Sequence, residues 1–449
     1  MDSLTPFGYD EPMNRVLGLF DSSLLVIGSV FGSGIFLTTG IVAGYLPFSG
    51  LIWIVWAAGG LITMAGALCY GELGSLFPQA GGPYVYLREA YGPAAAFLFG
   101  WTFFWIIAGG GVAALAVGFS EYAVGILGGG SRPLIAIAAV VLLTLSNIRG
   151  IKTGARLQSV LTIIRVGAIG GLIAGAVIFA TKAGISHIGP LFPPGSSPGF
   201  PWTAFGAAFV AVFWAYDGWY SVNCAAEEIT SPGRTIPRSL ALGTGTVLIL
   251  YLAANIVYSI ALPMEEMRGM VRIGEAAAAS LFGSGNAAIF SAAIAMAVLG
   301  CLGANILFCA RVPFAMSRDG LFPSAFGKVH PATDSPANAL LGQMIWASVL
   351  CLSGTYERLI EFVMFASVLF YAATAGAVLV LRRKMPEASR PYRVWGYPLL
   401  PVFYILINFG IFAALVLERP LPSLAGAAIM LTAWPAFRFW NRGSPCLRA

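Results

Sequence analysis

The chain has 449 residues, of which 58% are hydrophobic and 10% are charged, and its formal net charge is +6. A soluble globular chain carries about a quarter of charged residues, so this composition excludes a water-soluble protein and predicts a polytopic membrane protein. The apolar runs have the length of helices and lack the short alternation of an outer-membrane barrel. Basic cytoplasmic loops explain the small positive charge, which requires no nucleic-acid partner.

About twelve apolar segments are long enough to cross a lipid bilayer as helices. In chain order they are Leu17–Tyr45, Gly50–Phe77, Pro93–Ile126, Pro133–Asn147, Leu157–Thr181, Trp202–Ala226, Leu240–Leu262, Ala287–Met316, Asn338–Gly354, Leu359–Leu381, Leu399–Leu417 and Leu421–Phe437. We therefore expect an all-α integral membrane protein.

The lysines and arginines are concentrated in alternate loops between these segments. Clusters such as Arg149, Lys152 and Arg156, or Arg382, Arg383 and Lys384, would lie on one side, while single residues such as Arg132 would lie on the other. Basic residues favour the cytoplasmic side of a membrane. The distribution predicts that both termini, residues 1–16 and 441–449, are cytoplasmic.

Two of the apolar segments contain a glycine-marked break near mid-membrane. One is Gly32-Ser33-Gly34 and the other is Trp214-Ala215-Tyr216-Asp217-Gly218-Trp219. Lipid cannot satisfy the backbone groups that a break exposes, so each break must face protein, water or a polar ligand. Paired breaks in two halves of one chain are typical of secondary transporters built from inverted repeats. We expect one five-helix repeat over 17–190, an inverted one over 200–382, and two further helices over 383–440.

The first break has the chemistry to bind a zwitterion. Backbone N–H groups of Gly32, Ser33 and Gly34, at the start of a half-helix near Ile35, suit a carboxylate, and the Ser33 hydroxyl adds a donor. The half-helix that ends near Val30 offers free carbonyls, including that of Ser29, to an ammonium group. The alternative is that these glycines serve only a close helix crossing of the GxxxG kind.

An ordered set of short motifs resembles the amino acid–polyamine–organocation superfamily, and within it the L-type amino acid transporters and the bacterial serine/threonine exchangers. Besides the two breaks, the motifs are Tyr70-Gly71-Glu72-Leu73, Pro78-Gln79-Ala80-Gly81-Gly82-Pro83-Tyr84-Val85-Tyr86, Glu227-Glu228 with Pro232 and Pro237-Arg238, Met316-Ser317-Arg318-Asp319-Gly320, and Arg390-Pro391-Tyr392-Arg393 with Gly396-Tyr397-Pro398. The resemblance implies a LeuT-type fold and sodium-independent exchange of neutral L-amino acids by alternating access. It further implies a bacterial inner-membrane protein.

The same resemblance assigns roles at the second break. Main-chain carbonyls of Trp214, Ala215 and Asp217 would face the substrate ammonium group, and Trp214 would be an aromatic gate over the substrate. Packing or an interfacial position is the alternative for Trp214. For Trp219 and Tyr220, a place in the pocket wall and a place in helix packing both stay open.

Two charged residues lie at membrane depth, where a charge is costly and usually functional. Asp217 would carry a proton, bind the substrate amine or cap the following half-helix, and we favour capping. Arg165 would replace a coupling cation, because related transporters hold a lysine near this point and arginine cannot release its proton. A misjudged helix end or a structural salt bridge is the alternative for Arg165.

Two further residues are weaker candidates. Asn305 would face the pocket or bond to a neighbouring helix. Glu72, like the Glu227-Glu228 pair, would join Arg88, Arg234 or Arg238 in an inner gate, or remain solvated.

Other patterns argue against a metal site, a cofactor or an enzyme. The six cysteines and two histidines show no metal-ligand spacing, and no catalytic motif is present. The loop Gly128-Gly129-Gly130-Ser131-Arg132-Pro133 lacks the cysteine that joins animal L-type transporters to a heavy chain, so we expect no disulfide-linked partner. Three other functions stay open: a proton-coupled symporter, a transporter of cationic amino acids or polyamines, and a non-transporting amino-acid sensor.

Overall fold

The structure, a computed structural model, describes residues 15–149, 151–180, 187, 202–331, 333, 335–353, 355–418 and 420–441. Over these residues the fold is built from helices, and the β-structure they contain is a single bridge between Leu17 and Ile229. The expected all-α class is confirmed.

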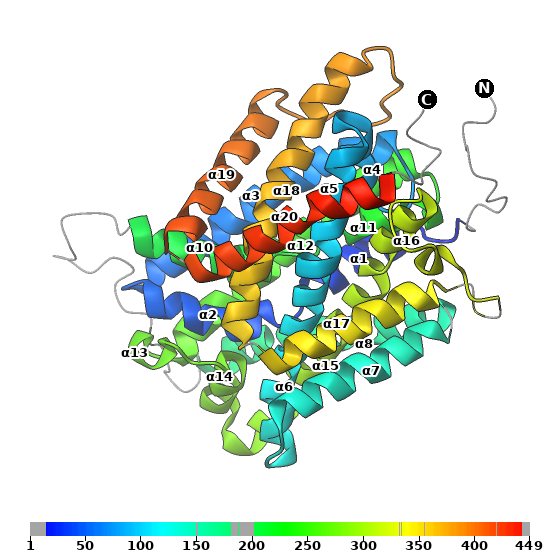
Figure 1. The fold of residues 1–449 in the computed structure, drawn as a ribbon. Coiled ribbons are helices and arrows are strands. Elements are labelled where there is room, and N and C mark those ends of the chain that lie inside the picture. Colours follow the sequence, from blue (N-terminus) through cyan, green and yellow to red (C-terminus); the bar gives the residue numbers. More distant parts are fainter. Residues whose placement is uncertain are drawn as a thin grey trace.

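The first part of the chain forms a broken helix, α1 and α2, followed by further helices of various lengths (Figure 1). Its elements are α1 (Leu19–Val30), α2 (Gly34–Tyr45), α3 (Ser49–Leu76), α4 (Pro83–Tyr91), α5 (Pro93–Thr102), the π-helical turn η1 (Phe103–Ala108), α6 (Gly109–Leu127), α7 (Arg132–Ile148), α8 (Ile151–Gly175) and the π-helical turn η2 (Ala176–Ala180). The axes of α1 and α2 differ by 40° at the first break.

The second part also begins with a helix that stops at its break. Its elements are α10 (Trp202–Ala215), α11 (Ser221–Cys224), the 3-10 turn η3 (Ala226–Glu228), α12 (Pro232–Ala261), α13 (Met264–Met267), α14 (Ile273–Phe282), α15 (Ser284–Cys309), α16 (Arg311–Arg318), the 3-10 turn η4 (Ser324–Gly327), α17 (Ala337–Ser353), α18 (Tyr356–Lys384), α19 (Leu399–Glu418) and α20 (Pro420–Asn441). The helix α10 ends at Ala215, inside the break that the sequence predicts.

Among the described residues, 8 helices are long and apolar enough to cross a membrane, or up to 9 if α1 and α2 count as one span. Helices α7, α10 and α17 coincide with expected spans but are shorter apolar helices. The expected number of twelve spans therefore stays a prediction. Helix α12 begins at Pro232, before the span expected from Leu240.

The helices form one bundle in which the broken pair is central. Helix α12 packs against α3 and α1, α10 packs against α2, and α15 packs against α6, α7 and α8 (Figure 1). Helix α19 lies beside α18, and α20 contacts both α5 and α18. The two breaks are thereby brought to the middle of the bundle, away from its apolar outer surface.

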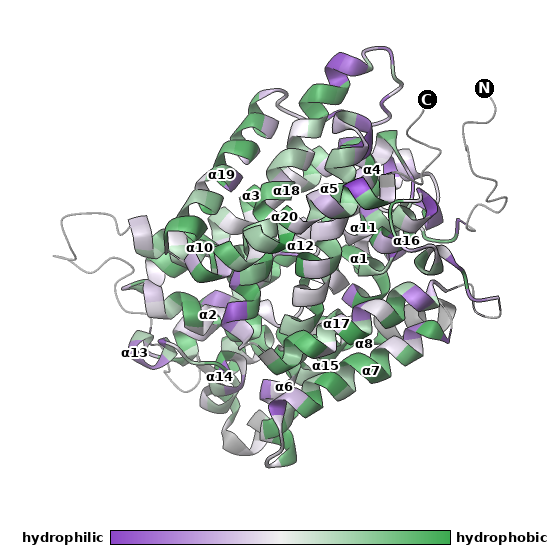
Figure 2. Cartoon of the chain, viewed as in Figure 1, coloured by the Kyte–Doolittle hydropathy of each residue, from purple (hydrophilic) through white to green (hydrophobic). Residues whose placement is uncertain are grey.

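The outer surface is apolar in the way that a lipid environment demands. Hydrophobic residues run along most helices, and hydrophilic ones gather at their ends and in the loops (Figure 2). The side chains of Leu417, Leu421 and Leu431 are 81%, 79% and 73% exposed. Large contiguous apolar surfaces are rare on soluble monomers, so these helices are suited to contact lipid.

A short backbone clamp joins the segment before α1 to the segment after the second break. The N–H groups of Val16 and Leu17 both donate to the carbonyl of Glu228 at 2.9 Å. The N–H of Thr230 donates back to the carbonyl of Leu17, also at 2.9 Å. These bonds hold the start of α1 against η3.

Candidate functional site

The glycines of the two breaks allow the broken helices to touch. A Cβ atom on Gly34 would lie 2.5 Å from the Cα atom of Ala215, and one on Gly32 would lie 2.5 Å from Cys301 Sγ. Gly218 has a φ of 93°, and its Cβ would lie 2.7 Å from the carbonyl oxygen of Ser29. No other residue fits these contacts without displacement. Close packing, which we kept as an alternative for the first break, is thus part of what its glycines do.

The first break leaves three backbone donors at the start of α2. Ser33 precedes the helix, and the first bonds within it are those from the N–H of Phe36 and Leu37 to the carbonyl of Ser33. The N–H groups of Ser33, Gly34 and Ile35 have no acceptor among the described residues. Together with the helix dipole they form a site for an anion.

The N–H group of Gly32 does not belong to this set. It donates to the carbonyl of Val30 at 2.8 Å. The expectation that it would face a carboxylate is therefore wrong in this structure.

The carbonyl groups of the breaks already have donors from neighbouring helices. The Tyr251 hydroxyl lies 3.0 Å from the carbonyl oxygens of both Val30 and Ala215. The Ser29 carbonyl accepts from Cys301 Sγ at 3.1 Å and from Asn305 Nδ2 at 3.5 Å. The single proton of Tyr251 serves one of its two carbonyls at a time, and the Val30 carbonyl also accepts from the N–H of Gly32 at 2.8 Å. The expectation of a free Val30 carbonyl is wrong.

A small cavity of about 30 Å³, enough room for a water molecule, lies between the two breaks. It is lined by Ser29, Val30, Gly32, Ser33, Gly34, Ile107, Ala108, Gly111, Val112, Leu115, Trp214, Ala215, Asp217, Gly218, Tyr220, Cys301, Asn305 and Cys309. Most candidate residues from both breaks, and Asn305, are therefore gathered around one space. The wall that the sequence did not indicate comes from η1 and α6 (Ile107 to Leu115) and from the cysteines of α15.

Two candidate residues from the breaks, Ile35 and Trp219, do not line the cavity. The Ile35 side chain is fully buried and faces other residues, although its N–H belongs to the donor set. Trp219 packs against Tyr70 with ring centroids 4.6 Å apart and against Tyr371 at 5.9 Å. Of its two possible roles, the structure therefore places Trp219 in helix packing. Tyr220, for which the same two roles stayed open, does line the cavity.

Asp217 lines the cavity, but its carboxylate already accepts two hydrogen bonds. It accepts from the N–H of Gly218 at 2.6 Å and from the hydroxyl of Tyr371. The N-cap position of α11 belongs to Tyr220, which precedes Ser221. The capping role predicted for Asp217 is therefore wrong in its formal sense, although its carboxylate does satisfy one backbone donor of the break.

An aromatic pair closes one side of the cavity. The Trp214 indole N–H donates to the hydroxyl of Tyr356 at 3.1 Å, and the same hydroxyl lies 2.9 Å from Ser33 Oγ. Sequence reasoning missed Tyr356 and Tyr251. A single tyrosine at the start of an apolar segment reads as an interfacial residue, and one inside a segment reads as packing.

Outside the cavity wall, a second set of contacts joins α16, α11, η3 and the loop before α4. The N–H of Gly81 donates to the carbonyl of Cys224 at 3.3 Å, and the buried side chains of Arg311 and Glu228 form an ion pair. Arg88 pairs with Asp319 at 2.7 Å. The predicted partners for Glu228 and Arg88 are therefore wrong.

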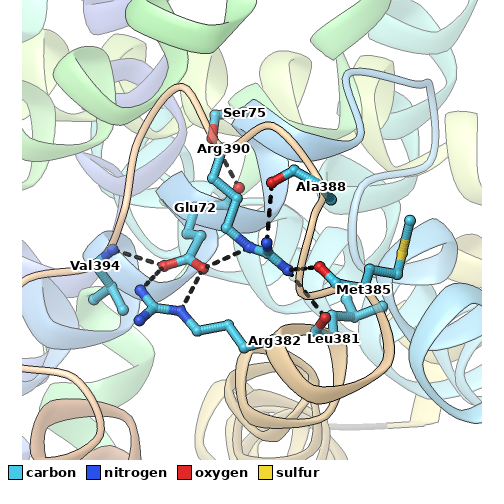
Figure 3. A network of polar contacts seen from close by, with 8 residues as sticks. All are labelled: Glu72, Ser75, Leu381, Arg382, Met385, Ala388, Arg390 and Val394. Atoms are coloured by element: carbon cyan, nitrogen blue, oxygen red, sulfur yellow. Dashed lines mark hydrogen bonds and ion pairs between the residues drawn. The ribbon is translucent and has the colours of Figure 1, made fainter.

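Glu72 is the centre of a buried polar network remote from the cavity (Figure 3). Its carboxylate accepts from Arg382 at 2.9 and 2.7 Å and from the N–H of Val394 at 2.7 Å, and it lies 3.5 Å from Arg390. Arg390 also donates to the carbonyls of Leu381, Met385 and Ala388. The predicted pairing of Glu72 with Arg88, Arg234 or Arg238 is wrong, and Glu72 instead fastens the loop after α18 to α3.

Arg165 lies on α8, but its side chain is outside the described residues. The role of this residue as a substitute for a cation stays a prediction. Nothing in the contacts above depends on it.

The comparison with protein families decides the identity of this bundle. The family model described as amino acid permease matches residues 17–434, which include both breaks and the Glu72 network. The chain belongs to the amino acid permease family. The expected family is confirmed, and the helical membrane architecture agrees with the LeuT-type fold that the resemblance implies.

Several curated proteins resemble this permease over most of their length. The serine/threonine exchanger SteT of Bacillus subtilis is 31% identical over 95% of this chain and 97% of its own. The b(0,+)-type amino acid transporter 1 of mouse is 28% identical over 91% of this chain and 84% of its own. The human large neutral amino acids transporter small subunit 2 is 28% identical over 97% and 82%.

Proposed function

We propose that this permease is a secondary transporter that exchanges neutral L-amino acids across a membrane by alternating access, without sodium. The observation that carries the proposal is the donor set of Ser33, Gly34 and Ile35 beside the cavity. These N–H groups suit a carboxylate. The carbonyl of Ala215, close to Gly34, accepts from Tyr251 with one lone pair and keeps a second one for an ammonium group. The relatives described above, an exchanger and two amino acid transporters, support this reading.

The satisfied carbonyls support independence from sodium. A sodium ion is held by several oxygen ligands, as other hard cations are. Here the carbonyls of Ser29 and Val30 accept from Cys301, Asn305 and Tyr251. Protein donors therefore stabilise the broken backbone in the place of a cation. A fixed charge at Arg165 would act in the same direction.

The position of the cavity between the two breaks supports alternating access. Trp214, which lines the cavity, bonds to Tyr356, and Arg311 bonds to Glu228 on the segment after the second break. A transporter of this kind opens one side at a time around a fixed site. The five-helix repeats over 17–190 and 200–382, with α19 and α20 outside them, are the frame we propose for that movement.

The membrane context follows from the same reasoning. Both termini are proposed to be cytoplasmic, because basic residues favour that side of a membrane. The bacterial inner membrane is proposed from the family resemblance. The glycine-rich loop over 128–133 offers no cysteine for a disulfide-linked heavy chain. We propose neither catalytic activity nor a cofactor for this permease.

One observation favours a second mode of transport. Asp217 is a carboxylate at the cavity wall, bonded to the hydroxyl of Tyr371. Acids inside membranes often relay protons. Proton-coupled symport, of neutral or cationic substrates, is therefore the alternative. A sensor that binds an amino acid without moving it is the alternative from another class.

The test is uptake of radiolabelled L-serine and L-leucine into proteoliposomes in sodium-free buffer. We expect uptake when the vesicles contain unlabelled amino acid and almost none when they are empty. Uptake into empty vesicles that follows an imposed pH gradient would establish the symporter instead. Binding without flux would establish the sensor, and uptake that requires sodium would contradict the proposal.

A further inference from the structure

Tyr356 occupies the point where the two breaks approach each other. It is the first residue of α18, and its side chain is buried. Its hydroxyl lies 2.9 Å from Ser33 Oγ on the first break and 3.1 Å from Trp214 Nε1 on the second. The donor set and the carbonyls assigned above do not use this hydroxyl, so its place in the site needs its own explanation.

The chemistry of the three groups restricts the direction of the hydrogen bonds. An indole N–H can only donate, so the Tyr356 oxygen accepts from Trp214. The single proton of Tyr356 is then free to point to Ser33. Ser33 can either accept that proton or donate its own to the tyrosine oxygen. Two arrangements are therefore possible when the cavity is empty.

A bound carboxylate would select one of the two arrangements. Ser33 lies beside the N–H groups of Gly34 and Ile35, where an anion would sit. A hydroxyl next to an anion donates to it, so Ser33 must then accept from Tyr356. All donors would point the same way, from Trp214 through Tyr356 and Ser33 to the carboxylate. Aligned hydrogen bonds polarise and strengthen one another.

We propose that Tyr356 is a positioning residue, which couples a substrate carboxylate at Ser33 to the closure of Trp214 over the cavity. This inference rests on the proposed function and deepens it. The ligand class is a free α-carboxylate, because the oxygen of an uncharged carboxamide accepts the same hydrogen bond much more weakly. The gate would thus be held most firmly when a complete amino acid is bound.

Packing around Ser33 and Tyr356 holds the two side chains in place. Gly118 of α6 faces both partners, because a Cβ atom there would lie 3.2 Å from Ser33 Cβ and 3.2 Å from Tyr356 Cε2. The ring of Tyr356 therefore has little room to move while the gate is closed. Removal of its hydroxyl alone would leave this packing intact.

The test is Tyr356→Phe, measured by the inhibition of exchange with L-serine, L-leucine and their carboxamides. We expect the affinity for both amino acids to fall about tenfold, the effect of one hydrogen bond in a charged chain. The affinity for the carboxamides should change little. The matched control is Tyr258→Phe, because the buried Tyr258 hydroxyl has no partner among the described residues.

A second variant and a double variant guard against a misfolded protein. Trp214→Phe keeps an aromatic ring but loses the N–H donor. It should also lower the affinity for amino acids relative to the affinity for their carboxamides. Ser33→Ala combined with Tyr356→Phe should cost less than the sum of the two single changes, because both break one chain.

Other outcomes would overturn the inference. An equal loss for amino acids and carboxamides would mean that Tyr356 is only structural, and unchanged affinities would mean that its hydroxyl is idle. If the wild type exchanges no amino acid at all, the proposed function fails and this inference with it. The two failures can be told apart. In the first the wild type shows no exchange, and in the second it exchanges normally and Tyr356→Phe has the same affinities.

Discussion

At the scale of single residues, the site depends on glycines, because their missing side chains allow close backbone contacts. Gly34 brings the start of α2 against Ala215, and Gly218 brings the second break against the carbonyl of Ser29. Each contact is between backbone atoms that cannot turn aside. At Gly34 the N–H group is also left without an acceptor among the described residues, so close packing and ligand binding have one common cause at this position.

Gly34→Ala should therefore reduce exchange strongly. The added Cβ would lie 2.5 Å from the Cα atom of Ala215, and overpacking of this kind costs about 1–3 kcal/mol. Since about 1.4 kcal/mol corresponds to a factor of ten, uptake should fall by about fivefold to about a hundredfold. Proteoliposome exchange measures the effect. Gly410→Ala is the control, because a Cβ there meets no atom within 4 Å and its activity should be normal.

At the scale of elements, the loop between α18 and α19 is fastened by charge. Glu72 on α3 is 1% exposed and accepts from Arg382 and Val394, while Arg390 caps the carbonyls at the end of α18. These groups come from α3, from the end of α18 and from the loop that follows α18. The network fixes the end of α18, the helix whose first residue is Tyr356, against α3.

Glu72→Gln should destabilise the protein strongly. Removal of one partner from a buried ion pair leaves an uncompensated charge and costs about 3–5 kcal/mol. We expect a clear fall in the melting temperature of the detergent-solubilised protein. Glu121→Gln is the control, since Glu121 pairs with Arg132, whose side chain is 60% exposed, and exposed pairs contribute little. Equal melting temperatures for the two variants would contradict this account.

At the scale of the whole molecule, the class and the breaks could be predicted from the sequence, but the partners of the breaks could not. Glycines that interrupt apolar runs identified Gly32–Gly34 and Trp214–Trp219 before any fold was known. Tyr251 and Tyr356 carry no such local signal, because one tyrosine in a helix looks the same whether it packs or bonds. The partners of Glu72 lie more than 300 residues away, so nearby arginines were chosen wrongly.

The short helices α13 and α14 were missed for a related reason. They lie between two long spans, and α13 has glutamates at Glu265 and Glu266, so the segment reads as a loop. Only the packing of α14 against α12 and α15 gives it a place in the fold. Sequence periodicity cannot report such contacts.

The orientation of the molecule can be tested with two matched substitutions in exposed loops. The substitutions are Ser131→Cys, at an exposed residue between α6 and α7, and Ser389→Cys, at an exposed residue between α18 and α19. On intact cells, a membrane-impermeant maleimide should label the first and spare the second, because basic loops face the cytoplasm. The parent chain gives the background from its native cysteines. The reverse pattern would invert the topology.

The backbone clamp between Val16, Leu17 and the segment after the second break limits how the molecule can move. If α1 swung away alone, it would break the bonds from Val16 and Leu17 to Glu228 and the bond from Thr230 to Leu17. If α1 and η3 travel together, none of these bonds is lost. The two broken spans then move as one rigid unit. On that side, the opening that loses fewest bonds separates this unit from Arg311, at the ion pair with Glu228.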